Sequence, residues 1–272
     1  MAHTNLDDTQ LDRPPIDRAA EIRLPEPQVV GIRARIGVVL PSANSVVEHD
    51  LALLGVRGVT FHAARMYVEP TPQGVEGGFL SVLGHTRAAM RDAIRDVLTC
   101  DPTYLMMATT AETFWGGVEG NHDFEARVVE QSGLGVTTGA TAIKAALDEL
   151  GCKRIAILTP YKKIADREAR QFFDESSFET VNNISLECRT PTDIARIDSA
   201  MLIDALRSLN SDDIDAIVQC GTNLSMVRLA DEAERWLGKP VLAINAVTAW
   251  HALRSCGIDD QFDGLGSVLR EL

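Results

Sequence analysis

Short apolar runs rich in β-branched residues alternate along this chain with longer segments in which apolar residues recur every three or four positions. The first pattern predicts buried strands and the second predicts amphipathic helices. The predicted strands cover residues 36–40, 59–63, 104–108, 155–159, 214–219 and 241–244. The clearest predicted helices cover residues 86–98, 140–150, 164–174, 200–209 and 226–237. Such alternation is typical of the α/β class, in which helices cover both faces of a parallel sheet.

The first predicted strand has an echo in the second half of the chain. Residues 35–41 read RIGVVLP and residues 154–160 read RIAILTP. A second pair of similar strands ends in Ala-Thr-Thr at 108–110 and in Cys-Gly-Thr at 220–222. These two pairs predict pseudo-symmetric α/β lobes that face each other. Ligands bind at the carboxyl ends of the strands in such folds, so the strand ends of both lobes are expected to converge on one cleft.

The chain divides into three predicted parts. Residues 1–32 are rich in Asp, Arg and Pro and show no apolar period, so we expect a mobile N-terminal arm. Residues 33–138 together with 248–272 are predicted to form the first lobe, and residues 139–247 the second.

Composition narrows the possible partners. The 272 residues are 45% hydrophobic, which is enough for a sizeable core. A net charge of −13, with no dense cluster of Lys and Arg, argues against nucleic-acid binding. The chain has no run of 18 apolar residues and a polar N-terminus, so we expect neither a membrane span nor a secretory signal, and a cytoplasmic location. A small-molecule substrate is the partner that remains.

Several common kinds of site lack their sequence signatures. The five cysteines are widely spaced, and the six histidines form no i, i+4 pair, so neither a disulfide framework nor a metal site is predicted. The serine-hydrolase motif G-x-S-x-G and the dinucleotide motif G-x-G-x-x-G after a strand are absent as well.

Cys220 is the residue that points most directly to chemistry. It follows an apolar run and precedes the polar turn 221–223, where a thiol could lie beside free backbone N–H groups at the end of a strand. That placement favours proton-transfer chemistry. The alternative interpretation is a small buried cysteine that fills space in the core.

A set of short motifs, taken in order, resembles the aspartate/glutamate racemase superfamily in its arylmalonate decarboxylase and maleate isomerase branch. The motifs are PSAN at 41–44 followed by Glu48, FH at 61–62 with RM at 65–66, GG at 116–117, TPY at 159–161, CGT at 220–222, and GKPV at 238–241 leading to Trp250. The resemblance runs from about residue 33 to 258. It implies two pseudo-symmetric flavodoxin-like lobes with parallel sheets, an active site in the cleft between them, and no metal or organic cofactor.

For racemases and isomerases of this superfamily, the resemblance implies two cysteines, with one thiol near the strand end of each lobe. Counting back from the glycine pair at 116–117 places the first thiol position at Thr109, where no cysteine is found. The decarboxylase group is similar in keeping only the second cysteine, and it also resembles this chain at the aromatic pair 114–115. The resemblance therefore favours decarboxylation of a malonate-type dicarboxylate over two-base racemisation.

Decarboxylation would leave an enediolate whose charge must be held by preorganised donors until a proton reaches the α-carbon. A thiol of ordinary pKa is mostly protonated at neutral pH, so Cys220 could deliver that proton. Alternative structural roles are a strand-end aromatic for Tyr161, a strand-terminal cap for Thr110 and a helix N-cap for Asn44. The expected substrate-binding and oxyanion-binding groups are Ser42, Asn44, Thr109, Thr110, Ala111, Glu112, Tyr161, Gly221 and Thr222.

Glu112 departs from the family pattern. It lies where the resemblance implies an apolar pocket residue, and a carboxylate there would suit an ammonium or hydroxyl group on the substrate. A polar-substituted or amino-bearing substrate is therefore expected, unless Glu112 points into solvent as loop glutamates commonly do.

Other functions remain open at this point. A maleate-type cis-trans isomerase with Cys220 as nucleophile is favoured by the motif 41–44, Glu48 and Arg65. A racemase and a non-catalytic dicarboxylate-binding relative are the remaining alternatives. A homodimer or higher homo-oligomer is expected only because such assemblies are common.

Overall fold

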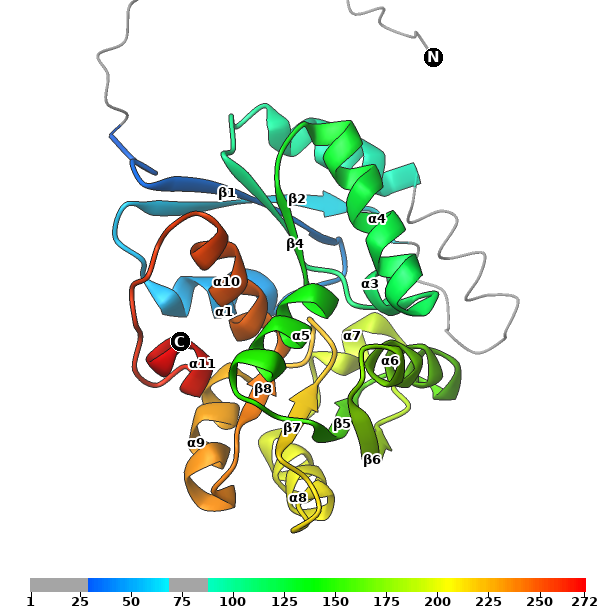
Figure 1. Ribbon diagram of the computed structural model, residues 1–272. Coiled ribbons are helices and arrows are strands. Elements are labelled where there is room, and N and C mark those ends of the chain that lie inside the picture. The colour runs from blue at the N-terminus through cyan, green and yellow to red at the C-terminus, as the bar shows by residue number, and fades with distance from the viewer. Residues whose placement is uncertain (1–28, 69–87) are drawn as a thin grey trace, which may run out of the picture.

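The computed structural model describes residues 29–68 and 88–272, and within them the expected α/β fold is confirmed (Figure 1). Eight parallel strands form two four-stranded sheets, ordered β2-β1-β3-β4 and β6-β5-β7-β8. The first sheet contains β1 (Ala34–Pro41), β2 (Val59–Met66), β3 (Tyr104–Met107) and β4 (Val136–Thr138). The second contains β5 (Arg154–Thr159), β6 (Glu179–Ser185), β7 (Ala216–Gln219) and β8 (Val241–Ala243). Most of the predicted N-terminal arm and the start of the predicted helix 86–98 lie outside the described residues.

The helices connect the strands and cover the sheets. Residues 88–98 are helical, as predicted. The other helices are α1 (Val47–Leu54), α3 (Ala111–Phe114), α4 (Gly117–Ser132), α5 (Gly139–Glu149), α6 (Lys163–Glu175), α7 (Pro191–Ile194), α8 (Ser199–Leu209), α9 (Val227–Leu237), α10 (Ile244–Ser255) and α11 (Ser267–Glu271). No helix among these described segments is long and apolar enough to cross a membrane.

The sequence echo corresponds to a structural repeat. β1 and β5, which carry the two copies of the motif, both lie in the interior of their sheets. β1 pairs with β2 and β3, and β5 pairs in the same way with β6 and β7. Ile36 pairs with Tyr104 in one sheet, and its counterpart Ile155 pairs with Ala216 in the other. The sheets therefore share one register as well as one strand order.

The two sheets are joined by packed helices. α10 contacts β3 and β4 of the first sheet, β8 of the second, and α5, which lies at the level between the sheets in Figure 1. Phe114 of α3 packs against Phe172 and Phe173 of α6, with ring centroids 5.2 and 5.5 Å away. The predicted lobe boundary at residue 248 falls inside α10. This helix is buried along most of its length and contacts both sheets.

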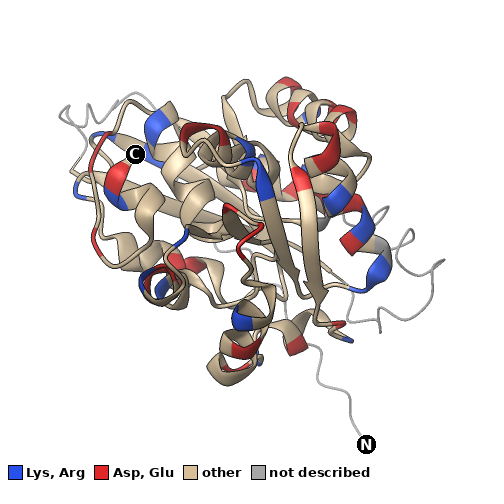
Figure 2. Cartoon of the chain, turned by 60° about the horizontal axis from the view of Figure 1, so that its bottom comes forward, with Lys and Arg blue, Asp and Glu red and all other residues tan. Residues whose placement is uncertain are grey.

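Charged residues of both signs are mixed over the surface. In the view of Figure 2, Lys and Arg alternate with Asp and Glu along the helices, and no continuous basic face is visible. In this view, therefore, the acidic residues of the described segments are spread over several helices and loops.

Candidate active site

The loops that follow the four interior strands meet at one place between the sheets. The amide of Asn44, after β1, donates to Thr222 Oγ1, after β7, at 3.3 Å. The Thr222 backbone N–H donates in turn to Thr110 Oγ1, after β3, at 3.1 Å. Burial holds these groups away from water. Residues more than a hundred positions apart are therefore brought together where the cleft was expected.

Cys220 lies at the end of β7 and is completely buried. Its backbone N–H donates to the Leu158 carbonyl at 2.9 Å, which fixes it to the neighbouring strand β5. Burial raises the pKa of the Cys220 thiol well above its usual range, and the charge of Asp166 raises this pKa further. The sulfur therefore carries its proton at neutral pH, as a general acid requires.

Asp166 is a charged neighbour of this site that the sequence did not indicate. It belongs to the first turn of α6 and is 7% exposed. Its carboxylate accepts from Thr159 Oγ1 at 3.1 Å and from the Asn183 amide at 2.8 Å. Only its position beside the end of β5, known from the fold, connects it with Cys220.

The counterpart of Cys220 in the first sheet is Ala108. The Ala108 N–H donates to the Val39 carbonyl at 2.8 Å, just as the Cys220 N–H donates to the Leu158 carbonyl. Val39 and Leu158 occupy the same place in the repeated strand motif. The assignment of the missing thiol to Thr109 is therefore wrong by one residue, because counting back from residues 116–117 crosses α3 and a turn that the sheet register does not constrain.

Thr110 and Tyr161 form a pair of hydroxyls beside the thiol. Thr110 is at the N-cap position of α3, yet its side chain makes no capping hydrogen bond. Burial raises the pKa of Tyr161, a hydrogen bond with Thr110 lowers it, and the nearby Cys220 and Glu112 raise it again. The net effect is upward, so the Tyr161 hydroxyl stays protonated and can donate. The Thr222 N–H, expected as a substrate donor, is occupied by Thr110.

Gly221 provides a backbone N–H next to the thiol. Its φ of +147° lies in a region that favours glycine, and a Cβ at this position would be 2.6 Å from Pro160 Cγ. Within the described part of the chain the Gly221 N–H has no hydrogen-bond acceptor. The N–H of Ala111, the first residue of α3, has no acceptor within its helix either. The Gly221 N–H is thus a backbone donor available next to the thiol.

Ser42 and Asn44 are largely engaged in holding the loop after β1. Asn44 Oδ1 accepts from the backbone N–H groups of Val46 and Val47, both at 3.0 Å, so the helix-capping role considered for it is present. Ser42 Oγ accepts from the Val68 N–H at 3.0 Å. Arg65 forms an ion pair with Glu48 and donates to the Asn44 carbonyl at 2.8 Å. These groups therefore hold the loop after β1 in place.

Glu112 is half-buried, and a neighbouring hydroxyl holds its carboxylate. Its carboxylate accepts a hydrogen bond from Thr109 Oγ1. Its charge also acts on Tyr161, as the pKa of that residue shows. The alternative in which Glu112 points freely into solvent does not describe this geometry. Thr109 is buried and holds the carboxylate in place.

Two further residues of this neighbourhood escaped sequence interpretation. Asp50 of α1 and Asn245 of α10 are buried, and the Asn245 amide donates both to Asp50 Oδ2 at 2.7 Å and to the Thr222 carbonyl at 2.9 Å. The one available signal was an acidic residue on the apolar side of α1, beside Val47, Leu51 and Leu54.

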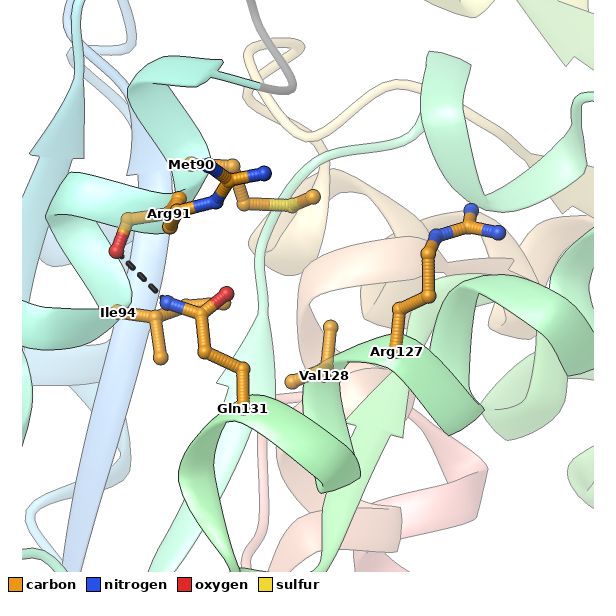
Figure 3. A pocket seen from close by; sticks show the side chains of 6 residues that line it. All are labelled: Met90, Arg91, Ile94, Arg127, Val128 and Gln131. Atoms are coloured by element: carbon orange, nitrogen blue, oxygen red, sulfur yellow. Dashed lines mark hydrogen bonds between the residues drawn. The ribbon is translucent and has the colours of Figure 1, made fainter.

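A separate hollow lies between the helix of residues 88–98 and α4 (Figure 3). It has a volume of about 240 Å³, and the Gln131 amide on its wall donates to the Arg91 carbonyl at 2.8 Å. The guanidinium groups of Arg91 and Arg127 stand on opposite sides of it. None of the expected site residues lines this hollow, which is formed by Met90, Arg91, Ile94, Arg127, Val128 and Gln131.

Comparison with known proteins supplies a family for this arrangement. The family model described as arylmalonate decarboxylase matches residues 36–269. The maleate isomerase of Nocardia farcinica is 28% identical over 253 residues, which cover 89% of this chain and 97% of that protein. The arylmalonate decarboxylase of Bordetella bronchiseptica is 28% identical over 226 residues, which cover 82% and 90%.

A solved structure gives the same picture. A cysteine-to-serine variant of the Nocardia farcinica maleate cis-trans isomerase, with a covalently bound succinylcysteine intermediate, superposes with a TM-score of 0.79 at 26% identity. The match covers 88% of this chain and 98% of that one.

Proposed function

The chain belongs to the arylmalonate decarboxylase family, and we propose that it is a cofactor-independent decarboxylase of a small malonate-type dicarboxylate, with Cys220 as the proton donor. Relatives with this fold include enzymes named as decarboxylases and enzymes named as isomerases. The choice between the two reactions therefore rests on the residues of this site. Cytoplasmic location and homo-oligomeric state stay predictions.

The observation that carries the proposal is the asymmetry between Cys220 and its counterpart Ala108. A methyl group can neither give nor take a proton, so of these two equivalent positions only Cys220 can serve as an acid or a base. Two-base racemisation needs an acid and a base on opposite faces of one carbon. A single acid on one face fits the protonation of a planar enediolate, which decarboxylation produces.

The proposed reaction uses the donors of the site in two steps. Cleavage of the carbon–carbon bond releases CO₂ and leaves its electron pair in the enediolate, whose oxygens are held by the N–H groups of Gly221 and Ala111 and the Tyr161 hydroxyl. The Cys220 thiol then gives its proton to the α-carbon, and solvent returns a proton to the thiolate. Burial and the charge of Asp166 favour this return of the proton to sulfur, because both make the thiolate a strong base.

The substituent on the substrate is proposed to be polar. Glu112, held by Thr109, places a half-buried carboxylate close enough for its charge to act on the Tyr161 hydroxyl. An apolar aryl group would gain nothing from a carboxylate, whereas an ammonium or hydroxyl group would form a charge-assisted hydrogen bond with it.

Maleate-type cis-trans isomerisation is the second candidate, and the succinylcysteine adduct in the Nocardia relative favours it. Here the Cys220 thiolate would add to one alkene carbon and push the electron pair of the double bond onto the other carbon and its carboxylate. Rotation about the former double bond, now single, would follow, and elimination of the thiolate would restore the double bond. The same burial that suits an acid opposes this route, since a nucleophile must first lose its proton.

Proton NMR of reactions in D₂O distinguishes the candidates. The wild type and Cys220→Ala are incubated with maleate and with 2-substituted malonates that carry aryl, hydroxyl or amino groups. We expect a monoacid with one deuterium at the α-carbon, formed by the wild type alone. Formation of fumarate from maleate without loss of CO₂ would replace the proposal with the isomerase, and undiminished turnover by Cys220→Ala would remove the thiol from either mechanism.

A further inference from the structure

A buried carboxylate outside the reacting set is connected to the loop that carries Cys220. Asp50 is 2% exposed and belongs to α1, whose other buried residues are apolar. Its Oδ2 accepts from the Asn245 amide at 2.7 Å. Among the described residues no Lys or Arg pairs with it, and the charged or titratable group that acts on it is His49, its exposed neighbour on α1. α10, which packs against α1, faces it with the neutral amide of Asn245.

Asn245 passes this contact on to the loop beside the thiol. Its Nδ2 has two hydrogens, one on Asp50 and the other on the Thr222 carbonyl at 2.9 Å. Its Oδ1 is buried and has no hydrogen-bond partner. An orphaned buried acceptor is costly, so the amide is held in this orientation by what its nitrogen contacts.

The ionised carboxylate determines that orientation. If the Asn245 amide were reversed, its oxygen would face two acceptors, the Asp50 carboxylate and the Thr222 carbonyl, and both contacts would be repulsive. A neutral group in place of the carboxylate removes one of the two repulsions. A protonated or amide group could even donate to the reversed oxygen, which would leave the Thr222 carbonyl without its donor.

Thr222 connects Asn245 with the loop that carries Cys220. Its carbonyl is held by Asn245, its N–H by Thr110 Oγ1 and its Oγ1 by Asn44. The free N–H of Gly221 directly precedes it, and Cys220 is two residues away. A loop fixed at its carbonyl as well as at its N–H keeps that free donor aimed at one point.

We propose that Asp50 is a positioning residue which, through Asn245, fixes the 220–223 loop and so aims the Gly221 N–H at the reacting group. This inference rests on the proposed function only in taking Cys220 as the centre of the reaction, and it holds for either candidate reaction. Burial of the Asp50 carboxylate is unfavourable. The carboxylate is nevertheless the group suited to this position, because a neutral side chain would not exclude the reversed orientation of the Asn245 amide.

Hydrogen exchange of the 220–226 segment, followed by mass spectrometry, tests this directly and needs no substrate. The proteins are the wild type, Asp50→Asn, Asn245→Ala and the double variant. We expect exchange of this segment to rise about tenfold in each single variant, and the double variant to show no further rise. The wild type supplies the same comparison without a substitution, since protonation of Asp50 at pH 5 should loosen the segment relative to pH 7.5, after correction for intrinsic exchange.

Asp231→Asn is the matched control. Asp231 is equally buried but pairs with Arg235 at 2.7 Å and Arg270 at 3.2 Å, remote from Thr222 in the hydrogen-bond network. This variant should lose stability and keep the exchange of 220–226 unchanged. We also expect Asp50→Asn to lower kcat more than it raises KM, because the fold and the binding groups persist.

The outcomes separate this inference from the proposed reaction. Unchanged exchange of 220–226 in folded Asp50→Asn, together with no difference between the two pH values in the wild type, would overturn the positioning role whatever the activity. Faster exchange in the variants combined with full turnover by Cys220→Ala would leave the positioning role intact and remove the proposed function.

Discussion

Ala108 and Cys220 occupy equivalent positions in the two sheets, each donating its backbone N–H to the matching residue of the repeated strand, Val39 or Leu158. The distances are 2.8 and 2.9 Å. At these equivalent positions one sheet thus carries a methyl group and the other a thiol. The backbone positions are equivalent, but only one of the two side chains can donate a proton. This difference predicts the stereochemistry of the product.

Ala108→Cys should create a second proton donor on the opposite face. With a prochiral 2-substituted malonate, the wild type should give one enantiomer, and Ala108→Cys a product of reduced enantiomeric excess. Ala108→Cys combined with Cys220→Ser should invert the product. Chiral chromatography reads the outcome. Thr109→Cys, one residue out of register, is the control and should leave the enantiomeric excess high; equal effects of both cysteines would contradict the assigned equivalence.

Asp166→Asn should make the thiol more acidic. Burial is the larger cause of the raised pKa of Cys220, and the charge of Asp166 raises it further. Removal of that charge should therefore lower the pKa of Cys220 and increase the thiolate fraction. We expect alkylation of Cys220 by iodoacetamide at pH 7.5 to be at least about threefold faster. Asp174→Asn, an exposed residue of the same helix, should have no effect. Equal rates in Asp166→Asn and the wild type would show that its charge does not reach the sulfur.

Gly221→Ala should damage both stability and turnover. Its φ of +147° is strained for alanine, and the new methyl carbon would meet Pro160 Cγ at 2.6 Å. We expect a loss of about 1–3 kcal/mol in the free energy of unfolding, from urea denaturation, together with a fall in kcat. Gly238→Ala has a positive φ of 70° and open space around it, so it should cost about 1 kcal/mol and leave kcat unchanged.

Glu112→Leu should shift substrate preference. Removal of the carboxylate takes away the partner of a hydroxyl or ammonium group and leaves an apolar wall. The ratio of kcat/KM for an aryl-substituted malonate over a hydroxyl- or amino-substituted one should rise by about tenfold or more. Glu112→Gln, which keeps the shape and loses the charge, should shift the ratio less. No change in either variant would place the substituent elsewhere.

Much of this site follows from local pattern in the sequence. The apolar runs at 36–40 and 155–159 lie within β1 and β5, and the motifs after them reach the cleft because parallel strands end at one edge. β6 was missed, since this edge strand contains Glu179, Asn182 and Asn183 and has no buried apolar run.

Long-range polar contacts could not be read in the same way. Asp50 and Asn245 are 195 positions apart, and their hydrogen bond exists only because α1 and α10 pack together. The one-residue error between Ala108 and Thr109 has a similar origin: sheet register, not distance along the chain, determines which residue opposes Cys220.

Asp50 should also make stability depend on pH. Burial is the main cause that raises its pKa from 3.8 to about 6, so the folded state binds a proton more tightly than the unfolded state. The free energy of unfolding contributed by this group is therefore highest below pH 4 and falls as pH rises toward 6, by about 3 kcal/mol at most. Asp50→Asn should remove this dependence and be as stable as the wild type or more so at pH 7.5. Urea denaturation at pH 5 and 7.5 measures the pH dependence and the stability of the variant. If Asp50→Asn were less stable than the wild type at pH 7.5, the Asp50 carboxylate would be stabilised by its surroundings and not penalised by burial.

The most direct test of the central claim is the fate of deuterium in a single product. The wild type and Cys220→Ala are each given a prochiral, polar-substituted malonate in D₂O, and the monoacid is examined for deuterium content and handedness. If the Cys220 thiol protonates an enediolate from one side, the wild type yields one enantiomer with one α-deuterium, and Cys220→Ala loses at least about a hundredfold in rate. A racemic product from the wild type, or an unchanged rate in Cys220→Ala, would contradict the account.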